Sequence, residues 1–348
     1  MDGSRAAARS RPMPLITTLI PAYKKAHLAE ALIGLRRQSI KDFKVIVSDD
    51  SPDDEITSLL REGSLKEAAS GLDLEVVRGP KNGRRNHQFL LTQWYGSTPF
   101  VHFHLDDDVI YPDFYRQHLE AHAGGPYSIS VSRRWFGDVT AAPTQGVALP
   151  DCVAGSPLHV VPVDASTLFK TTVPTCTNWL GEFTNMLISA DAALLWPLPP
   201  EEGISYYGWM DVGMLLTAVQ QRPVAVIREH LSVFRRHPEQ STHRYHNHSG
   251  RVASLAWAVY AMQAWREQRI SHRDAVAAIS HTVMQCFKRH GEDDPVINEF
   301  YDIVQHEGVS LDRLIRAFTP FWQTLLRSDD STFPHSVPTH HSDCLEFA

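Results

Sequence analysis

Short apolar runs alternate with segments of helical periodicity through the first third of the chain. The run LITTLIPAY at residues 15–23 is rich in β-branched side chains, and HLAEALIGLRRQSI after it repeats apolar residues at helical spacing. The same order returns in FKVIVSDDSPDDE, in LDLEVVRG with RRNHQFLLTQWYG, and in FVHFHL. Strands that alternate with helices build an α/β fold, so we predict a doubly wound mixed sheet flanked by helices.

The rest of the chain divides into regions of different pattern. Between residues 127 and 191 the periodicity weakens and Pro, Gly and Thr become frequent, which predicts loops and short antiparallel strands around a pocket. Segments of helical periodicity then follow up to residue 327. We predict a disordered leader over 1–13, an α/β domain over 14–248, a helical extension over 249–327 and a disordered tail over 328–348.

The composition of the 348 residues excludes several classes of protein. A formal net charge of −7 and a pI near 6.2 argue against a basic surface for nucleic acid. The four cysteines form no C-x-x-C pair, so neither a disulfide framework nor a thiolate zinc site is indicated. No run is apolar for long enough to span a bilayer, and no signal-peptide pattern occurs. A cytoplasmic protein is therefore expected.

The amphipathic segments after residue 249 leave two arrangements open. They can pack on the α/β domain, which is the favoured arrangement, or lie against the inner face of a membrane as a peripheral contact.

An acidic triplet, Asp106-Asp107-Asp108, follows the predicted strand FVHFHL. Adjacent carboxylates repel one another unless a cation or hydrogen-bond donors offset their charge. Mg²⁺ and Mn²⁺ take oxygen ligands, commonly one or two carboxylates together with substrate phosphates. The triplet therefore predicts a divalent metal shared by Asp106 and Asp108, and a solvated acidic turn is the alternative.

Three motifs occur in an order that resembles glycosyltransferase family 2. They are Pro21-Ala22-Tyr23 after the first strand, Asp49-Asp50 after the second, and the acidic triplet. The segment NGRRNHQFL before the triplet strand also matches, with Asn86 at the position of the family's recurrent Asn. The resemblance covers about residues 15–244. It implies a GT-A type fold and an inverting, metal-dependent glycosyltransferase that uses a nucleotide-sugar.

Carried over to this chain, the resemblance implies a donor site and a metal site. Tyr23 would lie against the nucleoside and Asp50 would accept a hydrogen bond from the base, with a loop aromatic and a helix N-cap as the alternatives. His237 lies in a late R-x-H setting and would be a third metal contact, which favours Mn²⁺ over Mg²⁺. The implied donor residues are Pro21, Ala22, Tyr23, Asp50, Arg85, Asn86, Asp106 and Asp107, and the implied metal ligands are Asp108, Asp106 and His237.

The acceptor side carries the implied catalytic base. The family places an acid at the start of a helix, and SYYGWMDVGMLLTAV offers Asp211 there, with Met210 where the family often has a second acid. Asp211 would take the proton of the acceptor hydroxyl, and a helix cap is the alternative. Trp209 and Tyr207 would cover a sugar ring or else belong to the core. Glu182 and Asn185 are weaker candidates for the sugar and acceptor pocket.

These residues predict the partners and leave two other functions open. The imide N–H of uracil or thymine suits the Asp50 carboxylate, so a UDP-sugar or dTDP-sugar donor is favoured. The acceptor would be a hydroxyl of a glycan, a lipid-linked sugar or a small molecule, as in polysaccharide or glycoconjugate biosynthesis. The alternatives are a metal-dependent nucleotidyltransferase, for which no Gly-rich phosphate loop occurs, and a catalytically silent nucleotide-sugar-binding or scaffold protein.

Overall fold

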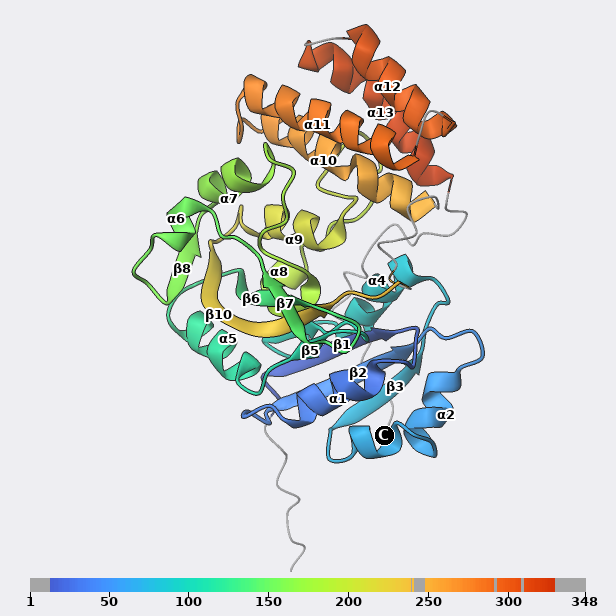
Figure 1. Ribbon diagram of the computed structural model, residues 1–348, viewed down its shortest axis with the longest axis vertical. Helices are drawn as coiled ribbons and strands as arrows, with labels where there is room; N and C mark the ends of the chain where they lie inside the picture. The colour runs from blue at the N-terminus through green and yellow to red at the C-terminus, as the bar shows by residue number, and fades with distance from the viewer. Residues whose placement is uncertain (1–12, 239, 241–247, 291–292, 308–309, 329–348) are drawn as a thin grey trace, which may run out of the picture.

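The computed structural model describes residues 13–238, 240, 248–290, 293–307 and 310–328 (Figure 1). The predicted leader and tail lie outside these residues, apart from Met13 and Ser328. Their predicted disorder therefore stays a prediction.

The first part of the chain forms a parallel sheet with the strand order β3-β2-β1-β4. These strands are β1 (Ile16–Ala22), β2 (Phe43–Asp49), β3 (Leu74–Arg78) and β4 (Phe100–Phe103). The helices between them are α1 (Leu28–Arg36), α2 (Glu55–Arg61), α3 (Lys66–Ala69) and α4 (Gly83–Trp94). The four strands and the helices α1, α2 and α4 lie where the alternating pattern predicted them, whereas the single-turn helix α3 was not predicted.

Helices cover both faces of this sheet. Successive residues of a strand point to opposite faces, so neighbouring apolar residues pack in different clusters. Leu19 of β1 packs in one apolar cluster with Leu90 of α4, whereas Ile20 packs in a second cluster with Leu32 of α1. Helix α5 (Phe114–Ala123) covers the same face as α1. The prediction of a doubly wound sheet flanked by helices is confirmed.

The second part of the sheet mixes strand directions. Strand β9 (Met186–Ser189) runs antiparallel to β4 and to β6 (Ile129–Gly137), and β10 (Val224–Arg235) runs parallel to β6. Shorter strands complete the sheet, namely β5 (Val109–Ile110) and β8 (Val160–Val163) on β10, and β7 (Pro143–Gly146) on β6. The region 127–191 was expected to hold only short antiparallel strands, but β6 spans nine residues and is parallel to β10. Its alternation is hidden because Ser130, Ser132 and Arg134 are buried polar residues.

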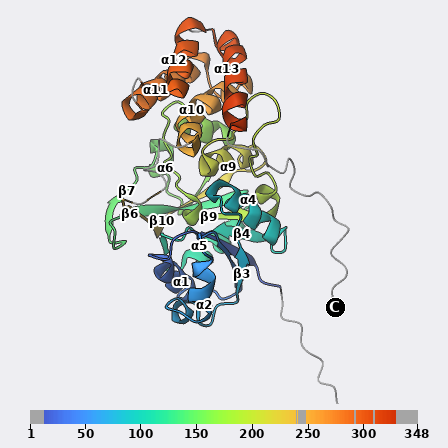
Figure 2. The ribbon, with the colours of Figure 1, turned by 90° about the vertical axis from the view of Figure 1, so that its right-hand side faces the viewer.

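Short helices and one turn connect the strands of the second part of the sheet. They are α6 (Asp151–Ala154), α7 (Ala165–Thr172), α8 (Ala190–Ala193), α9 (Met210–Ala218) and the 3₁₀ turn η1 (Phe183–Asn185). Figures 1 and 2 both place α9 between the sheet and the helices that follow β10.

The end of the described chain is a group of helices at one end of the molecule (Figure 1). These are α10 (His248–Arg266), α11 (His272–His290), α12 (Pro295–Glu307) and α13 (Leu311–Arg327). Leu255 and Ala258 of α10 belong to the same apolar cluster as Leu216 of α9, so α10 packs on the α/β domain. No helix within the described residues combines the length and the apolar character that crossing a bilayer requires.

Two glycines allow close packing around the start of α9, one against α10 and one against the loop that precedes α9. A Cβ at Gly208, where φ is +142°, would lie 2.7 Å from the Cβ of Ala256 in α10. A Cβ at Gly213 of α9 would lie 2.0 Å from the carbonyl oxygen of Tyr206. Because the Tyr206 oxygen is a backbone atom, it can move only if the loop before α9 moves with it.

Replacing Gly213 should therefore destabilise the protein despite the higher helix propensity of alanine. We expect Gly213→Ala to lower the free energy of unfolding by about 2 kcal/mol or more, since overpacking a core forces backbone shifts. Gly83→Ala in α4 is the control, because nothing lies within 4 Å of a Cβ there. Equal urea midpoints for the two variants would contradict this packing.

Candidate active site

The carboxyl ends of three neighbouring strands bring the sequence motifs together. Strand β1 lies between β2 and β4, and Ala22 is opposite Asp49. The backbone N–H of Asp50 donates to the Ala22 carbonyl at 2.8 Å. Asp106 Oδ2 accepts from the backbone N–H of Tyr23 at 2.8 Å and of Lys24 at 3.0 Å. The Tyr23 side chain is 48% exposed, so its ring is available to a ligand at this edge.

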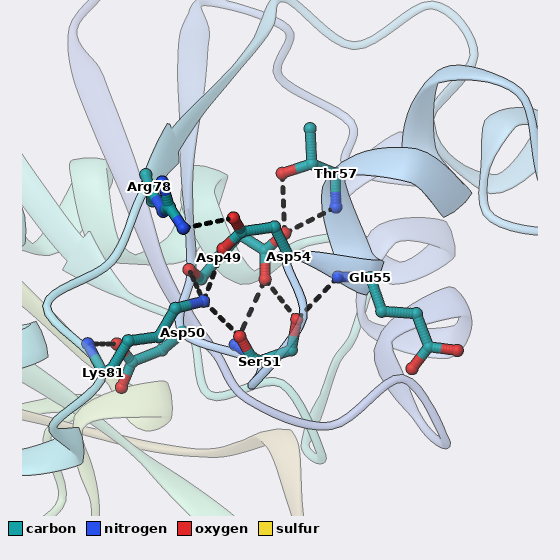
Figure 3. Close-up of polar contacts among 8 residues, drawn as sticks. All are labelled: Asp49, Asp50, Ser51, Asp54, Glu55, Thr57, Arg78 and Lys81. Carbon is teal, nitrogen blue, oxygen red and sulfur yellow. Dashed lines mark hydrogen bonds and ion pairs between the residues drawn. The ribbon is translucent and has the colours of Figure 1, made fainter.

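The two adjacent aspartates after β2 have different partners (Figure 3). Asp49 Oδ1 accepts from the backbone N–H of Ser51 at 3.1 Å, and Oδ2 accepts from the N–H and the hydroxyl of Thr57 at 2.7 and 2.6 Å. Burial alone would raise the pKa of Asp49, but these hydrogen bonds lower it. Asp49 thus holds the start of α2, as a helix cap does.

Asp50 instead faces the loop that follows β3. Its Oδ1 accepts from the backbone N–H of Lys81, and burial raises its pKa. A Cβ at Gly79 would lie 2.6 Å from this oxygen, so glycine is required for the carboxylate to lie there. The Lys81 ammonium contacts the Ser51 carbonyl and Asp54 (Figure 3). The cap alternative for Asp50 is wrong, because Asp49 carries out that role.

A fully buried arginine holds the acidic triplet. The backbone N–H of Arg235 donates to Asp108 Oδ1 at 3.0 Å, and its Nε donates to the Asp107 carbonyl at 2.7 Å. The same guanidinium donates to the Val139 carbonyl at 2.7 Å and forms an ion pair with Glu30. The ends of β4 and β10 are thereby tied together at the triplet.

His237 contacts the middle residue of the triplet. Its Nε2 lies 3.0 Å from Asp107 Oδ2, and the His27 ring is 5.2 Å away. The sequence grouped His237 with Asp106 and Asp108 as metal ligands. The structure pairs it with Asp107 instead, so a metal contact through Nε2 would require this hydrogen bond to open.

Negative charge accumulates at the triplet. Burial and the charge of Asp107 raise the pKa of Asp106 to about 6 and hold the pKa of Asp108 well above its usual range. The Asp108 carboxylate is near Thr184, yet its Oδ2 is buried and accepts no well-formed hydrogen bond from the described residues. A buried carboxylate oxygen without a donor is suited to a cation.

The described residues fit a metal site only if the substrate contributes ligands. Among them, no three His, Cys, Asp or Glu side chains are grouped as a site made of protein alone would need. A divalent ion that binds phosphates uses one or two protein carboxylates, and the carboxylates of Asp106 and Asp108 supply the oxygen donors that Mg²⁺ and Mn²⁺ prefer. The donor set therefore fits a metal completed by a diphosphate.

Helix α4 packs against β1 and β2, and its first residues include two of the predicted donor residues. Asn82 caps the helix, since its Oδ1 accepts from the backbone N–H of Arg85 at 3.2 Å. Asn86 is 1% exposed and its Oδ1 has no hydrogen-bond partner among the described residues. A donor role for Arg85 and Asn86 stays a prediction.

Asp211 lies in the first turn of α9 and is 6% exposed. Its Oδ1 accepts from the backbone N–H of Val212 at 2.7 Å, and its Oδ2 lies 3.5 Å from Asn178 Nδ2. Burial, followed by the negative charge of Glu182, raises the pKa of Asp211 to about 7. The N-cap residue is Trp209, so the cap alternative does not describe Asp211. A carboxylate with a pKa near neutrality is suited to take a proton.

The turn at residues 182–185 connects the triplet with Asp211. Thr184 Oγ1 accepts from the backbone N–H of Leu105 at 3.1 Å, directly before the triplet. The charge of Glu182 raises the pKa of both Asp108 and Asp211. Asp108 and Asp211 therefore share a charged neighbour, as two groups of one active site would.

Glu182 and Asn185 have partners within the protein. Glu182 forms an ion pair with Arg134, whose Nη2 donates at 3.0 Å. Asn185 is 1% exposed and its Nδ2 donates to the carbonyls of Ser132 and Leu180. A direct contact between Asn185 and a sugar is not supported by this burial, and its observed role is to support the turn at residues 182–185.

The two aromatic candidates differ in exposure. Tyr207 is 2% exposed and belongs to the apolar core, so the core alternative describes it. Trp209 is partly buried, and its ring packs edge-on against Trp257 of α10 at 5.9 Å. Trp209 is therefore the one of the two that can still line an acceptor pocket.

Sequence reasoning missed two residues that contact the candidate site, Arg134 through Glu182 and Asn178 through Asp211. Arg134 and Asn178 lie in the region of weak periodicity, and only their distant partners reveal them. Arg235 carried a signal, since it is the arginine of the R-x-H segment that ends in His237.

Comparison with known proteins identifies the α/β domain. Residues 17–154 match the family model described as Glycosyl transferase family 2. No curated protein sequence matches the chain. This match confirms, over these residues, the resemblance seen in the motifs.

Solved structures of S. aureus TarS have a similar fold. The structure of TarS 1–349 in complex with UDP-GlcNAc has a TM-score of 0.57 at 13% identity, covering 90% of this chain and 91% of that chain. Another structure of TarS 1–349 has a TM-score of 0.52 at 14% identity, covering 90% of each chain. A longer TarS structure has a TM-score of 0.51 at 15% identity. The alignment covers 90% of this chain and 55% of that chain. At these identities the likeness shows the fold, which is of the predicted GT-A type.

The raised pKa of Asp211 should make stability depend on pH. An unfolded aspartate loses its proton near pH 3.8, whereas the folded one keeps it up to about pH 7. The folded state therefore binds more protons between these values, and its stability falls as pH rises through this window. We expect Asp211→Asn to be more stable than the wild type at pH 8 by about 1–4 kcal/mol.

Urea unfolding of both proteins between pH 4 and pH 8 measures this effect. The difference between their midpoints should grow as pH rises and should nearly vanish at pH 4. A difference that stays constant over this range would mean that the pKa of Asp211 is ordinary.

Proposed function

We propose that this glycosyltransferase, whose residues 17–154 form a glycosyltransferase family 2 domain, moves a sugar from a nucleoside diphosphate donor to a hydroxyl acceptor with inversion. The observation that carries the proposal is Asp211, a buried acid with a pKa near 7 that shares the neighbour Glu182 with the acidic triplet. The turn at residues 182–185 then has Asp211, a base for the acceptor, on one side and the acidic triplet, whose carboxylates serve the donor, on the other.

The donor nucleotide would bind at the ends of β1 and β2. The exposed Tyr23 ring offers a face for the base, and Pro21 and Ala22 complete the strand end. The Asp50 carboxylate is held by the Lys81 N–H and can accept a further hydrogen bond from an imide N–H, as uracil and thymine have. TarS, which is similar in fold, was crystallised with UDP-GlcNAc, and this supports a UDP-sugar as the donor.

Asp108 and Asp106 would hold Mn²⁺ or Mg²⁺ together with the donor diphosphate. When bound, the ion neutralises the charge that develops on the leaving nucleoside diphosphate. Asp107 and His237 hold each other beside these ligands, and Arg235 fixes the backbone that carries them.

The transfer itself needs one proton acceptor. As the acceptor oxygen forms its bond to the anomeric carbon, the bond from that carbon to the nucleoside diphosphate breaks and the hydroxyl proton passes to Asp211. Attack from the face opposite the leaving group inverts the anomeric configuration. Trp209, partly buried beside the base, is suited to cover the apolar face of an acceptor sugar. A glycan, a lipid-linked sugar and a small molecule all remain candidate acceptors.

Removing the base should separate binding from chemistry. We expect Asp211→Asn to lower turnover by about 10²–10⁴-fold while the affinity for donor stays near that of the wild type. The measurement is nucleoside diphosphate release from a panel of UDP-sugars with Mn²⁺, with Asp274→Asn at the start of α11 as the control. Wild-type turnover in Asp211→Asn, or a product that retains the donor's anomeric configuration by NMR, would refute the mechanism. A wild-type protein that binds donors and turns none over would indicate the catalytically silent alternative.

Removing a metal ligand should weaken nucleotide binding only when a divalent metal is present. We expect Asp108→Asn to weaken UDP binding in Mn²⁺ by about tenfold or more and to leave UDP binding in EDTA unchanged, because the carboxylate acts through the ion. Calorimetry measures both affinities. Asp113→Asn is the control, since Asp113 is exposed and pairs with Arg116. Equal affinities of Asp108→Asn and wild type in Mn²⁺ would rule out this ligand.

A further inference from the structure

The start of α9 is held by a tyrosine of the helical extension. The Tyr260 hydroxyl accepts from the backbone N–H of Trp209 at 2.7 Å and donates to the Trp209 carbonyl at 2.7 Å. A hydroxyl has one donor and two acceptor sites, so both bonds form together. The Trp209 carbonyl also accepts the first helical bond of α9, from Gly213 at 2.8 Å. Trp209 has no side-chain cap, and Tyr260 takes that place.

Packing around this contact leaves the loop before α9 little freedom. Ala256, Trp257 and Tyr260 lie on one face of α10, where Ala256 meets Gly208 and Trp257 meets the Trp209 ring. Tyr260 is fully buried. Both views show α10 lying next to α9 (Figures 1 and 2). Any shift of α10 must therefore be transmitted to the residues directly before Asp211.

We propose that the helical extension positions the catalytic base, and that the Tyr260 hydroxyl is the contact through which it does so. The inference rests on the proposed role of Asp211. Tyr260 is a positioning residue, because it touches the backbone two residues before the base. A displacement of about 1 Å at a reacting group can cost on the order of 10²-fold in rate, so a contact that fixes this backbone matters for turnover.

The charged groups around Asp211 come from other elements. Glu182 approaches from the turn after Leu180, Arg134 from β6, and Asn178 is the polar neighbour. All three lie outside α10, so loosening the start of α9 changes the position and hydration of Asp211 while these groups keep their own places in the fold.

The test uses Tyr260→Phe in the full chain, which keeps the buried ring and removes both hydrogen bonds. Ser254→Ala is the matched control, because Ser254 lies in the same helix and its hydroxyl also makes two contacts, with the Gly250 carbonyl and with His290. We expect Tyr260→Phe to reduce UDP release from UDP-sugars by about 10–100-fold with unchanged affinity for UDP in Mn²⁺. Ser254→Ala should lose stability and keep its turnover.

A double variant distinguishes positioning from a merely structural role. In the Asp211→Asn background, Tyr260→Phe should cause no further loss of turnover, since the group that it positions is gone. Equal additional losses in both backgrounds would overturn the proposal. If Asp211→Asn itself retains wild-type turnover, the proposed function fails, whatever Tyr260→Phe does.

A second measurement needs no donor. Water that reaches Asp211 should bring its pKa toward the ordinary value, so the fall in stability between pH 5 and pH 8 should shrink in Tyr260→Phe and persist in Ser254→Ala. An identical pH dependence in the two variants would overturn the proposal. Should Tyr260→Phe fail to fold, Ala256→Val tests the same contact, because it crowds Gly208 and should lower turnover with UDP affinity retained.

Discussion

The buried Arg235 guanidinium is the interaction on which the candidate site depends. It brings one positive charge to a region where Asp106, Asp107, Asp108 and Glu30 meet, and its hydrogen bonds reach two backbone carbonyls as well. A charge that is fully buried is stable only when its partners satisfy it, and here those partners belong to separate strands and loops. The arginine therefore stabilises the acidic edge and fixes the position of β10 relative to β4.

Environment rather than residue type decides what each carboxylate can do. Asp49 accepts hydrogen bonds from a helix start, and its pKa is lowered, so it is a structural anion. Asp211 is buried near Glu182, and its pKa is raised to about 7, so it can exchange a proton near neutral pH. Asp50 lies between these cases, since burial raises its pKa while a backbone N–H fixes one of its oxygens. Carboxylates with divergent environments are the pattern from which acid and base roles are assigned.

Sequence reasoning succeeded where local pattern determines the result. The parallel strands are buried on both faces and are apolar in sequence, and the carboxyl ends of parallel strands meet at one edge. The alternating pattern therefore placed Tyr23, Asp50 and Asp106 at the same edge of the sheet. It could not decide roles that depend on a distant partner. The pairing of His237 with Asp107, the ion pair of Glu182 with Arg134 and the burial of Tyr207 depend on tertiary packing that no local periodicity encodes.

The helical extension belongs physically to the candidate site. Its helix α10 shares an apolar cluster with α9, and Gly208 leaves room for Ala256 of α10 beside the loop before α9. Such packing leaves α9 and α10 no room to move independently, since protein interiors are dense and transmit small displacements. A base that acts on a bound hydroxyl must be held within a fraction of an ångström, and a short helix of nine residues that begins after a loop cannot supply this rigidity alone. The face of α10 that meets α9 therefore constrains the position of Asp211, just as the strand ends constrain the carboxylates proposed to hold the donor.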